Sequence, residues 1–341
     1  MRVVSTTVIL TALLTACGTT DSAAVHAFQG ETMGTTYSIK VAAPAMTADG
    51  RRAVERAVAD VLDRIDRSMS TWRPDSELSR FNASPSTEST KVSDELLDVL
   101  ECAQRVSEES GGTFDVTVGP LVEAWGFGPK GRPARRPTDD EVADIRARVG
   151  NEKLIVDRAA GAIRKTVPGL TVDVGAIAPG YGSDRVGGAL EKLGYRNYMV
   201  ELGGEVRARG RKPDGAAWVI GIEQPDDDGR VVRRAVALAD ASLSTSGDYR
   251  DYYEEEDVRY SHTIDPRTGS PIAHNLASVS VVCDECMWAD AYATAVDVLG
   301  PDAGYDLAVE RKLPALFIMR ESAGVFRERA TPEFERRFGG G

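Results

Sequence analysis

The spacing of apolar residues predicts amphipathic helices in the first part of the chain. Valine, leucine and isoleucine recur every three or four positions over 51–69, and the same pattern follows an N-capping serine, Ser93. A Thr-Asp-Asp-Glu capping box that begins at Thr138 predicts a third, shorter helix. Between the second and third helices, the Gly-, Pro- and Arg-rich stretch 120–137 predicts a loop.

The pattern changes after residue 150, where short apolar or alternating runs predict strands; one such run also precedes the first helix. The predicted strands span 35–41, 154–156, 162–165, 170–174, 198–201, 206–209, 218–222, 233–239, 258–263, 278–282 and 315–319. The predicted helices among them span 183–193, 287–299 and 302–312. Consecutive strands with interspersed helices are typical of an α+β fold, built mostly on antiparallel sheets with packed helices.

The first residues predict a targeting signal. Arg2 precedes an apolar run over 3–14, which is too short to span a bilayer. The run ends in Leu-Thr-Ala-Cys17, which resembles the lipobox of bacterial lipoproteins. The resemblance implies a signal peptide over 1–16, lipid on Cys17, and an extracytoplasmic protein that this lipid anchors to the bacterial cell membrane. A plain signal peptide with a chance cysteine is the alternative.

The charge of the chain limits its partners. The formal net charge of −12 argues against nucleic acid as a partner, because phosphate backbones are bound by basic surfaces. An anionic ligand would therefore be bound locally, by the amides of a glycine-rich loop, by a helix N-terminus or by a metal ion.

Cysteine usage adds little to the function. Cys283 and Cys286 form a Cys-x-x-Cys pair that no histidine follows, which excludes covalent haem attachment. The pair could close a small disulfide in an oxidising compartment, but we favour two half-buried thiols at a strand end.

The polar stretch 246–271 contains the first candidate for catalysis. It combines Asp, Tyr, Arg and His residues with turn-forming Gly and Pro around one short strand. His262 is one of only two histidines outside the N-terminal tail, so it is one of two candidates for acid–base work near neutral pH. A strand-end histidine is more often structural, and the rest of the chain has to support the catalytic interpretation.

Asp290 and Thr294 are the candidates for metal binding. They lie four residues apart on a predicted helix, so their oxygens lie on one face of one turn. A carboxylate, a hydroxyl and a backbone carbonyl suit Mg²⁺ that shares its ligands with a substrate phosphate. The Gly-rich segment 173–180 precedes a predicted helix and could bind phosphate through its amides. Taken singly, each of these features is also explained by a turn or a solvated helix face.

Together, these features closely resemble the ApbE family of FAD:protein FMN transferases from about residue 28 to about residue 304. The resemblance rests on the collinear order of the polar stretch 246–271 and five segments rich in Gly, Asp and Thr, which span 33–37, 112–117, 172–181, 200–205 and 289–294. It implies a Mg²⁺-dependent reaction in which FAD is split at its pyrophosphate. FMN is then joined by a phosphoester to a threonine or serine of an acceptor protein, and AMP leaves.

The resemblance also assigns roles to individual residues. Positions that contact FAD match Met33, Trp72 (just before Arg-Pro-Asp-Ser-Glu-Leu-Ser-Arg-Phe-Asn82), Thr113, Phe114, Asp115, Asp173, Pro179 and Ile264. The metal would be bound by the carbonyl of Ala176 and by the side chains of Asp290 and Thr294. His262 matches the base that deprotonates the acceptor hydroxyl.

The chain departs from the family at position 179. Many relatives have Ala-Lys-Gly where this chain has Ala178-Pro179-Gly180, so a cationic side chain and an amide donor are both missing. We expect this change to affect the affinity for FAD more than the chemistry, because the metal would carry the charge of the transition state.

The predicted organisation is a signal peptide over 1–16, a tether over 17–27 and one FAD:protein FMN transferase domain over 28–341. Two other functions stay open. One is an FAD pyrophosphatase, in which water replaces the acceptor hydroxyl and FAD yields FMN and AMP. The other is a non-catalytic FAD-binding lipoprotein. The presence of His262, Asp290 and Thr294 favours chemistry over storage.

Overall fold

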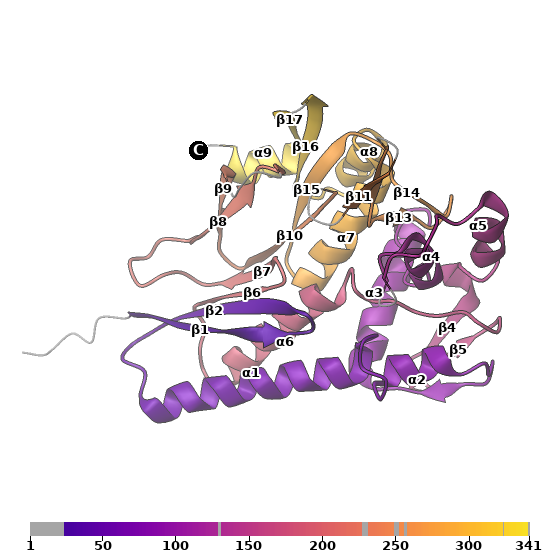
Figure 1. Cartoon of the computed structure of the whole chain (residues 1–341). Helices are drawn as coiled ribbons and strands as arrows, with labels where there is room; N and C mark the ends of the chain where they lie inside the picture. The colour runs from indigo at the N-terminus through magenta and orange to yellow at the C-terminus, as the bar shows by residue number, and fades with distance from the viewer. Residues whose placement is uncertain are drawn as a thin grey trace, which may run out of the picture.

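An eight-stranded antiparallel sheet forms the centre of the fold, as the computed structural model in Figure 1 shows. The structure describes residues 24–128, 131–226, 231–248, 252–255, 258–322 and 324–339. Its strands are, in spatial order, β1 (Ala24–Thr32), β2 (Thr35–Ala43), β6 (Tyr198–Leu202), β7 (Glu205–Arg209), β10 (Ala241–Gly247), β15 (Leu276–Cys283), β16 (Ala315–Ser322) and β17 (Val325–Ala330). Each neighbouring pair is antiparallel, which confirms the predicted α+β class.

Helices cover one face of this sheet. They are α1 (Ala48–Met69), α3 (Asp94–Glu109), α6 (Ala178–Lys192), α7 (Cys286–Leu299) and α8 (Ala303–Glu310). Because side chains alternate along a strand, Ile39, Val200 and Val279 lie in the core on the helical side, while Met199 and Leu243 face a second core. The second core is covered by the hairpin β8 (Trp218–Glu223)–β9 (Val232–Leu238) and by α9 (Pro332–Phe338).

A smaller layer lies beside α1 and α3. It contains α2 (Glu77–Ala83) and a three-stranded sheet with the order β3 (Thr90–Lys91), β5 (Ala162–Lys165) and β4 (Leu154–Asp157). A 3₁₀ turn (Asn151–Lys153) directly precedes β4. Next to it are α4 (Gly119–Trp125), α5 (Asp139–Arg146) and the hairpins β11 (Tyr252–Glu255)–β12 (Val258–Ser261) and β13 (Ile264–Asp265)–β14 (Ser270–Pro271). Within the described residues, no helix has the length and apolar character that a membrane span requires.

Helix ends with local capping signals lie where the sequence predicts them. Ser93 accepts a hydrogen bond from the N–H of Leu96, and Thr138 forms the predicted capping box with Glu141. Helix α6 begins at Ala178, five residues before the predicted start. The reason is Pro179, which occupies the first turn, where a missing N–H is tolerated.

Two other predictions of local structure are wrong, and a central strand was missed. The stretch 170–174 is not a strand, because its backbone groups bond to side chains and loops instead of a neighbouring strand. The predicted loop 120–137 contains most of α4, which starts with a proline at its N-terminus. The central strand β10 was not predicted, since its Ser-Leu-Ser-Thr-Ser sequence lacks the apolar pattern of a buried strand.

The N-terminal boundary also differs. Residues 24–27, expected in the tether over 17–27, belong to β1 and pair with residues 40–43 of β2. Arg51 reinforces this pairing by donating to the carbonyl of Ala27. The predicted signal peptide, Cys17 and the rest of the tether lie outside the described residues.

Two helices cap each other with carboxylates. Asp184 on α6 accepts hydrogen bonds of 2.9 Å from the N–H groups of Cys286 and Met287, the first residues of α7. Asp290 on α7 accepts one of 2.9 Å from the N–H of Gly180, in the first turn of α6. Each carboxylate thus satisfies free amides and faces the positive end of the partner helix.

This arrangement requires close contact between the helices. A Cβ at Gly180 would lie 2.6 Å from the carbonyl oxygen of Cys286, so only glycine fits there without movement of the backbone. Asp184 also forms a largely buried ion pair with Arg207 of β7. The same carboxylate therefore ties α6, α7 and the central sheet together.

We expect Asp184→Ala to lower the free energy of unfolding by about 3–5 kcal/mol, because it leaves the buried Arg207 unpaired and the α7 N-terminus uncapped. Urea denaturation followed by circular dichroism measures the loss. Asp49→Ala is the control, because Asp49 is 90% exposed in its pair with Arg52 and should change stability by less than about 1 kcal/mol. Equal effects of the two substitutions would contradict the capping role.

Candidate active site

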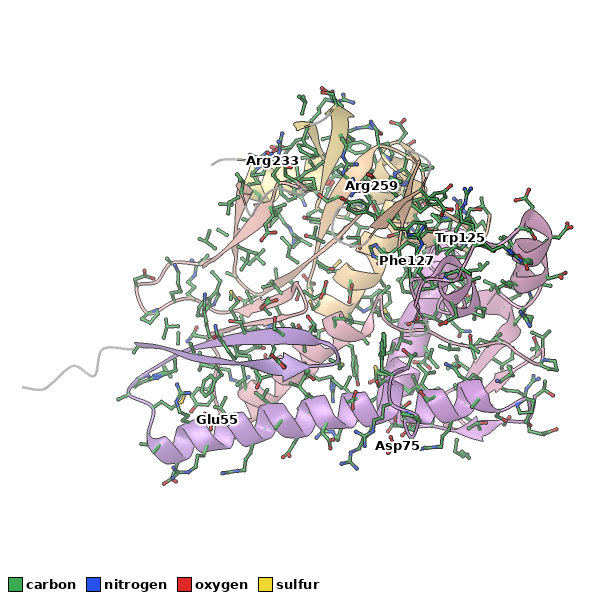
Figure 2. All side chains as sticks on the ribbon, viewed as in Figure 1. Glu55, Asp75, Trp125, Phe127, Arg233 and Arg259 are labelled. Atoms are coloured by element: carbon green, nitrogen blue, oxygen red, sulfur yellow. The ribbon has the colours of Figure 1, made fainter. Side chains whose placement is uncertain are left out.

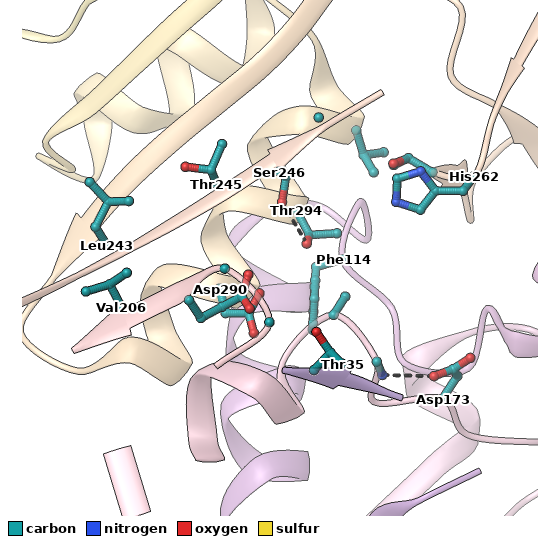
Figure 3. A pocket seen from close by; sticks show the side chains of 18 of the residues that line it. Thr35, Phe114, Asp173, Val206, Leu243, Thr245, Ser246, His262, Asp290 and Thr294 are labelled. Carbon is teal, nitrogen blue, oxygen red and sulfur yellow. Dashed lines mark hydrogen bonds between the residues drawn. The ribbon is translucent and has the colours of Figure 1, made fainter. Parts of the chain in front are cut away.

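A cavity of about 710 Å³ lies beside the first residues of β7, where the antiparallel strand β10 continues past them. β10 pairs with β7 only over Ala241–Leu243, and its last three residues, Thr245–Gly247, line the cavity. Figure 3 shows β10 crossing this space, with Asp290 and Thr294 of α7 on one side and His262 beyond them. Segments from distant parts of the chain complete the lining: 35–36, 113–118, 173–176, 201–206, 220–223 and 262–266.

The acid and hydroxyl predicted to bind metal lie close to serines of β10. Asp290 Oδ1 accepts a hydrogen bond of 3.4 Å from Ser244, and the hydroxyls of Thr294 and Ser246 are 3.2 Å apart. Asp290 is only 5% exposed, while Thr294 is half-buried. Ala176, the predicted source of a carbonyl ligand, lines the same cavity.

Burial makes the acids of the cavity hard to ionise. It raises the pKa of Asp290 to about 7, an effect that the amide of Gly180 and the hydroxyl of Ser244 oppose. Burial, together with the charge of Asp290, raises the pKa of Glu205 well above its usual range. Among the described residues that line the cavity, none is Lys or Arg. A bound cation would therefore stabilise the charged forms of these acids.

His262 lies at the opposite side of the cavity from Leu243 and Val206 (Figure 3). Its ring meets that of Phe127 edge-on at 6.4 Å, and Phe127 stacks on Tyr253 at 5.3 Å. Phe127 lies beside Trp125 at the end of α4, in the region labelled in Figure 2. These aromatic contacts hold the imidazole at the edge of the cavity.

The other candidate histidine lies away from this space. His274 is largely buried, and burial lowers its pKa, so it is a neutral side chain of the interior. It packs against Gly300, just after α7. His262 is thus the histidine that the described structure brings to the cavity.

The floor of the cavity consists of two loops bonded to each other. Asp115 accepts from both the N–H and the hydroxyl of Thr117, at 2.8 and 2.7 Å. The N–H of Asp173 donates to the carbonyl of Val116 at 2.6 Å, and the Asp173 side chain accepts from the N–H of Gly175. Burial raises the pKa values of Asp115 and Asp173.

Most predicted site residues line this one cavity. They are Thr113, Phe114, Asp115, Asp173, Ala176, His262, Ile264, Asp290 and Thr294. The structure does not place Met33, Trp72 or Pro179 in the lining. Met33 occupies a left-handed turn with φ of 46° and packs toward the core, and Trp72 is 73% exposed. Pro179 lies in the first turn of α6, near the cavity but not facing it.

Several lining residues have no role in the sequence-based prediction. Glu205 lies in the segment 200–205, one of the five that resemble the family. The neighbouring sequence does not show that its carboxyl group lies close enough to Asp290 to feel its charge. Thr245 and Ser246 belong to β10, the strand that was not predicted. The backbone of Ile220–Glu223 in β8 also borders the cavity, and only the fold of the hairpin over the sheet reveals this.

A cavity that combines buried acids, hydroxyls and a histidine on this α+β frame defines an enzyme site. The model of the ApbE family matches residues 33–317, and the chain belongs to that family. The relatives include the FAD:protein FMN transferase of Vibrio cholerae, 42% identical over 96% of this chain and 97% of its own length. The corresponding protein of Haemophilus influenzae is 40% identical over 88% of each chain.

Solved structures agree with this assignment. The flavin transferase ApbE from Vibrio cholerae superposes with a TM-score of 0.85 at 41% identity, covering 93% of this chain and all of that one. The apo form of the flavinyl transferase ApbE from Pseudomonas stutzeri has a TM-score of 0.85 at 39% identity, over 94% of this chain and 98% of its own. The fold of this chain is therefore that of the ApbE flavin transferases.

One buried acid near the site predicts a pH dependence of stability. Asp297 is fully buried on α7 and accepts from Thr263, the residue after His262; burial raises its pKa from 3.8 to about 8. The folded state thus keeps a proton that the unfolded state loses. This acid's contribution to stability is complete below pH 3.8 and is lost progressively up to about pH 8.

We expect Asp297→Asn to become more stable relative to wild type by about 1.4 kcal/mol per pH unit within that window. Urea denaturation at pH 5, 6, 7 and 8 measures the difference between the two proteins. Parallel stability curves for the variant and the wild type would show that Asp297 is not protonated in the folded state.

Proposed function

We propose that this chain is a Mg²⁺-dependent FAD:protein FMN transferase, which joins FMN to a threonine or serine of an acceptor protein and releases AMP. The observation that carries the proposal is that one cavity contains an acid–hydroxyl pair on α7 and, across from it, a histidine. Membership of the ApbE family, whose relatives bear this name, supports it.

The donor groups fit magnesium. Asp290, Thr294 and Ala176 offer a carboxylate, a hydroxyl and a carbonyl, all hard oxygen donors of the kind that Mg²⁺ prefers. In a regular helix the N–H of Gly180 would donate to the carbonyl of Ala176, four residues earlier. Here it donates to Asp290 instead. In the part of the chain that is described, no group of three His, Cys, Asp or Glu side chains could hold a metal ion, so the proposed site relies on a hydroxyl and a carbonyl beside one carboxylate. When bound, the cation would neutralise charge on the pyrophosphate.

The chain's own residues supply the remaining functions. The acceptor hydroxyl oxygen bonds to the phosphorus of the FMN half while His262 takes its proton. The bond from that phosphorus to the bridging oxygen breaks, and AMP leaves with this oxygen. The first turn of α6 lies next to Asp290, so its positive end favours the phosphates.

A transfer assay tests the proposal. The soluble part of the protein is mixed with FAD, Mg²⁺ and a candidate acceptor domain, and the acceptor is weighed by mass spectrometry while AMP is measured by chromatography. A transferase adds the mass of FMN to the acceptor. Release of AMP without labelling of the acceptor would instead identify a pyrophosphatase. Bound FAD with no AMP would identify a storage protein.

We expect His262→Ala to slow transfer by a factor of about 10²–10⁴ and to leave FAD binding nearly unchanged, because a general base acts on the chemical step. Rates come from the transfer assay at saturating FAD, and affinity from flavin fluorescence. His26→Ala is the matched control, since His26 lies on β1 outside the cavity lining and its ring hydrogen-bonds to the carbonyl of Pro44. A His262→Ala rate within threefold of wild type would remove this histidine from the mechanism.

We expect Asp290→Ala to lose Mg²⁺-dependent release of AMP, because the variant lacks the charged ligand of the cation. AMP is measured with and without chelator and acceptor. Asp302→Ala is the control, as this carboxylate is 93% exposed in its pair with Arg329. Full AMP release by Asp290→Ala in the presence of chelator would overturn the magnesium site.

A further inference from the structure

The segment from 170 to 176 lines the cavity without belonging to a helix or strand. Asp173, Gly175 and Ala176 face the cavity, so the position of this segment affects both the predicted FAD contact and the predicted metal ligand. Backbone polar groups of buried, irregular segments need partners from elsewhere in the chain. Here two side chains outside the site bind three of these groups.

Asn82, at the end of α2, pairs with the backbone of Val172. Its amide nitrogen donates to the carbonyl of Val172, and its amide oxygen accepts from the N–H of the same residue, both at 2.8 Å. The side chain thus satisfies both polar groups of one residue, as a neighbouring strand would. Val172 directly precedes Asp173, whose own N–H is bonded to Val116.

Lys165, at the end of β5, holds the start of the same segment. Its side chain is fully buried, and its ammonium group donates to the carbonyls of Phe81, Ser84 and Leu170 at 2.9, 2.7 and 3.1 Å. Two of these carbonyls lie at the C-terminus of α2, which favours a positive charge. The ammonium group therefore links the end of α2 to Leu170.

We propose that Asn82 and Lys165 are positioning residues, which fix the segment 170–176 so that Asp173 meets FAD and Ala176 meets the cation. The identity of these ligands rests on the proposed function. The inference also gives a role to the sequence Arg-Pro-Asp-Ser-Glu-Leu-Ser-Arg-Phe-Asn82. This sequence forms α2, and α2 supplies the groups that anchor the loop.

A purely structural role would act through stability alone, so the experiment separates stability from FAD binding. Asn82→Ala removes both hydrogen bonds to Val172 and is expected to weaken FAD binding about tenfold. The KM for FAD should rise by a similar factor, while kcat at saturating FAD changes by less than about threefold. Flavin fluorescence measures the affinity, and the transfer assay measures KM and kcat.

Gln104→Ala is the matched control. Gln104 also donates from a part-buried side-chain amide to a backbone carbonyl, that of Leu154, at 2.7 Å, but it holds strand β4 instead of the loop. We expect this variant to lose stability in urea without a change in FAD affinity. Equal FAD affinities of Asn82→Ala and wild type, or equal losses in Asn82→Ala and Gln104→Ala, would overturn the positioning role.

Asn82→Asp adds a pH test that a structural effect would not reproduce. The carboxylate keeps an acceptor for the N–H of Val172 but faces its carbonyl without a proton to donate. Partial burial and the facing carbonyl oxygen both disfavour the carboxylate, so the pKa of the introduced carboxyl should rise above its ordinary value of about 3.9. FAD binding by this variant should therefore be weak at pH 8 and should strengthen relative to wild type on acidification toward pH 5. An unchanged ratio of the two affinities over this range would count against the proposal.

Lys165→Met should weaken FAD binding in the same direction, with a larger loss of stability because the site is buried. If Lys165→Met does not fold, the FAD affinities of Asn82→Ala and Asn82→Asp test the positioning role. Wild-type protein that binds FAD but transfers nothing would overturn the proposed function. The positioning role would then be judged from the FAD affinity of each Asn82 variant relative to that of wild type. Wild-type protein that does not bind FAD would overturn both.

Discussion

The site depends on the mutual capping of α6 and α7. Asp184 and Asp290 each occupy the N-terminus of the other's helix, and Gly180 permits the close approach that this requires. Asp290 therefore reaches the cavity in an orientation set by a backbone amide and not by its rotamer preferences alone. The two carboxylates also repel each other, and Arg207 and the two helix ends offset this repulsion. The helices and the proposed cation site are thus one structural unit.

Features that depend on local sequence were predictable. The capped starts of α3 and α5 are confirmed because Ser93 and Thr138 form their hydrogen bonds within one turn. Asp290 and Thr294 lie on one face of α7 because their spacing alone determines this. The resemblance to the ApbE family was also visible in the order of short motifs, and that family is confirmed. The placement of His262 at the cavity agrees with the role inferred for it, although its role stays a prediction.

Features that depend on distant partners were not predictable. β10 is a central strand because β15 pairs with all but its first residue, and its small polar side chains face α7 instead of an apolar core. The stretch 170–174 has the composition of a strand. However, the side chains of Asn82 and Lys165 bind backbone groups of Val172 and Leu170 that would otherwise pair with a neighbouring strand. Nothing in the local sequence shows that Trp72 is exposed or that Glu205 faces Asp290, because both facts follow from how separate segments pack.

Pro179 has a consequence for how this enzyme can diverge. In the first turn of α6 a residue needs no amide hydrogen, so the missing N–H of Pro179 costs the helix no hydrogen bond, and a lysine would fit the same backbone. Position 179 can therefore vary in evolution without loss of stability. Under the proposed function, an uncharged side chain at this position attracts the phosphates of FAD and AMP less strongly than a lysine would. Under the proposed function, this position sets a balance between retention of substrate at low supply and rapid turnover at high supply.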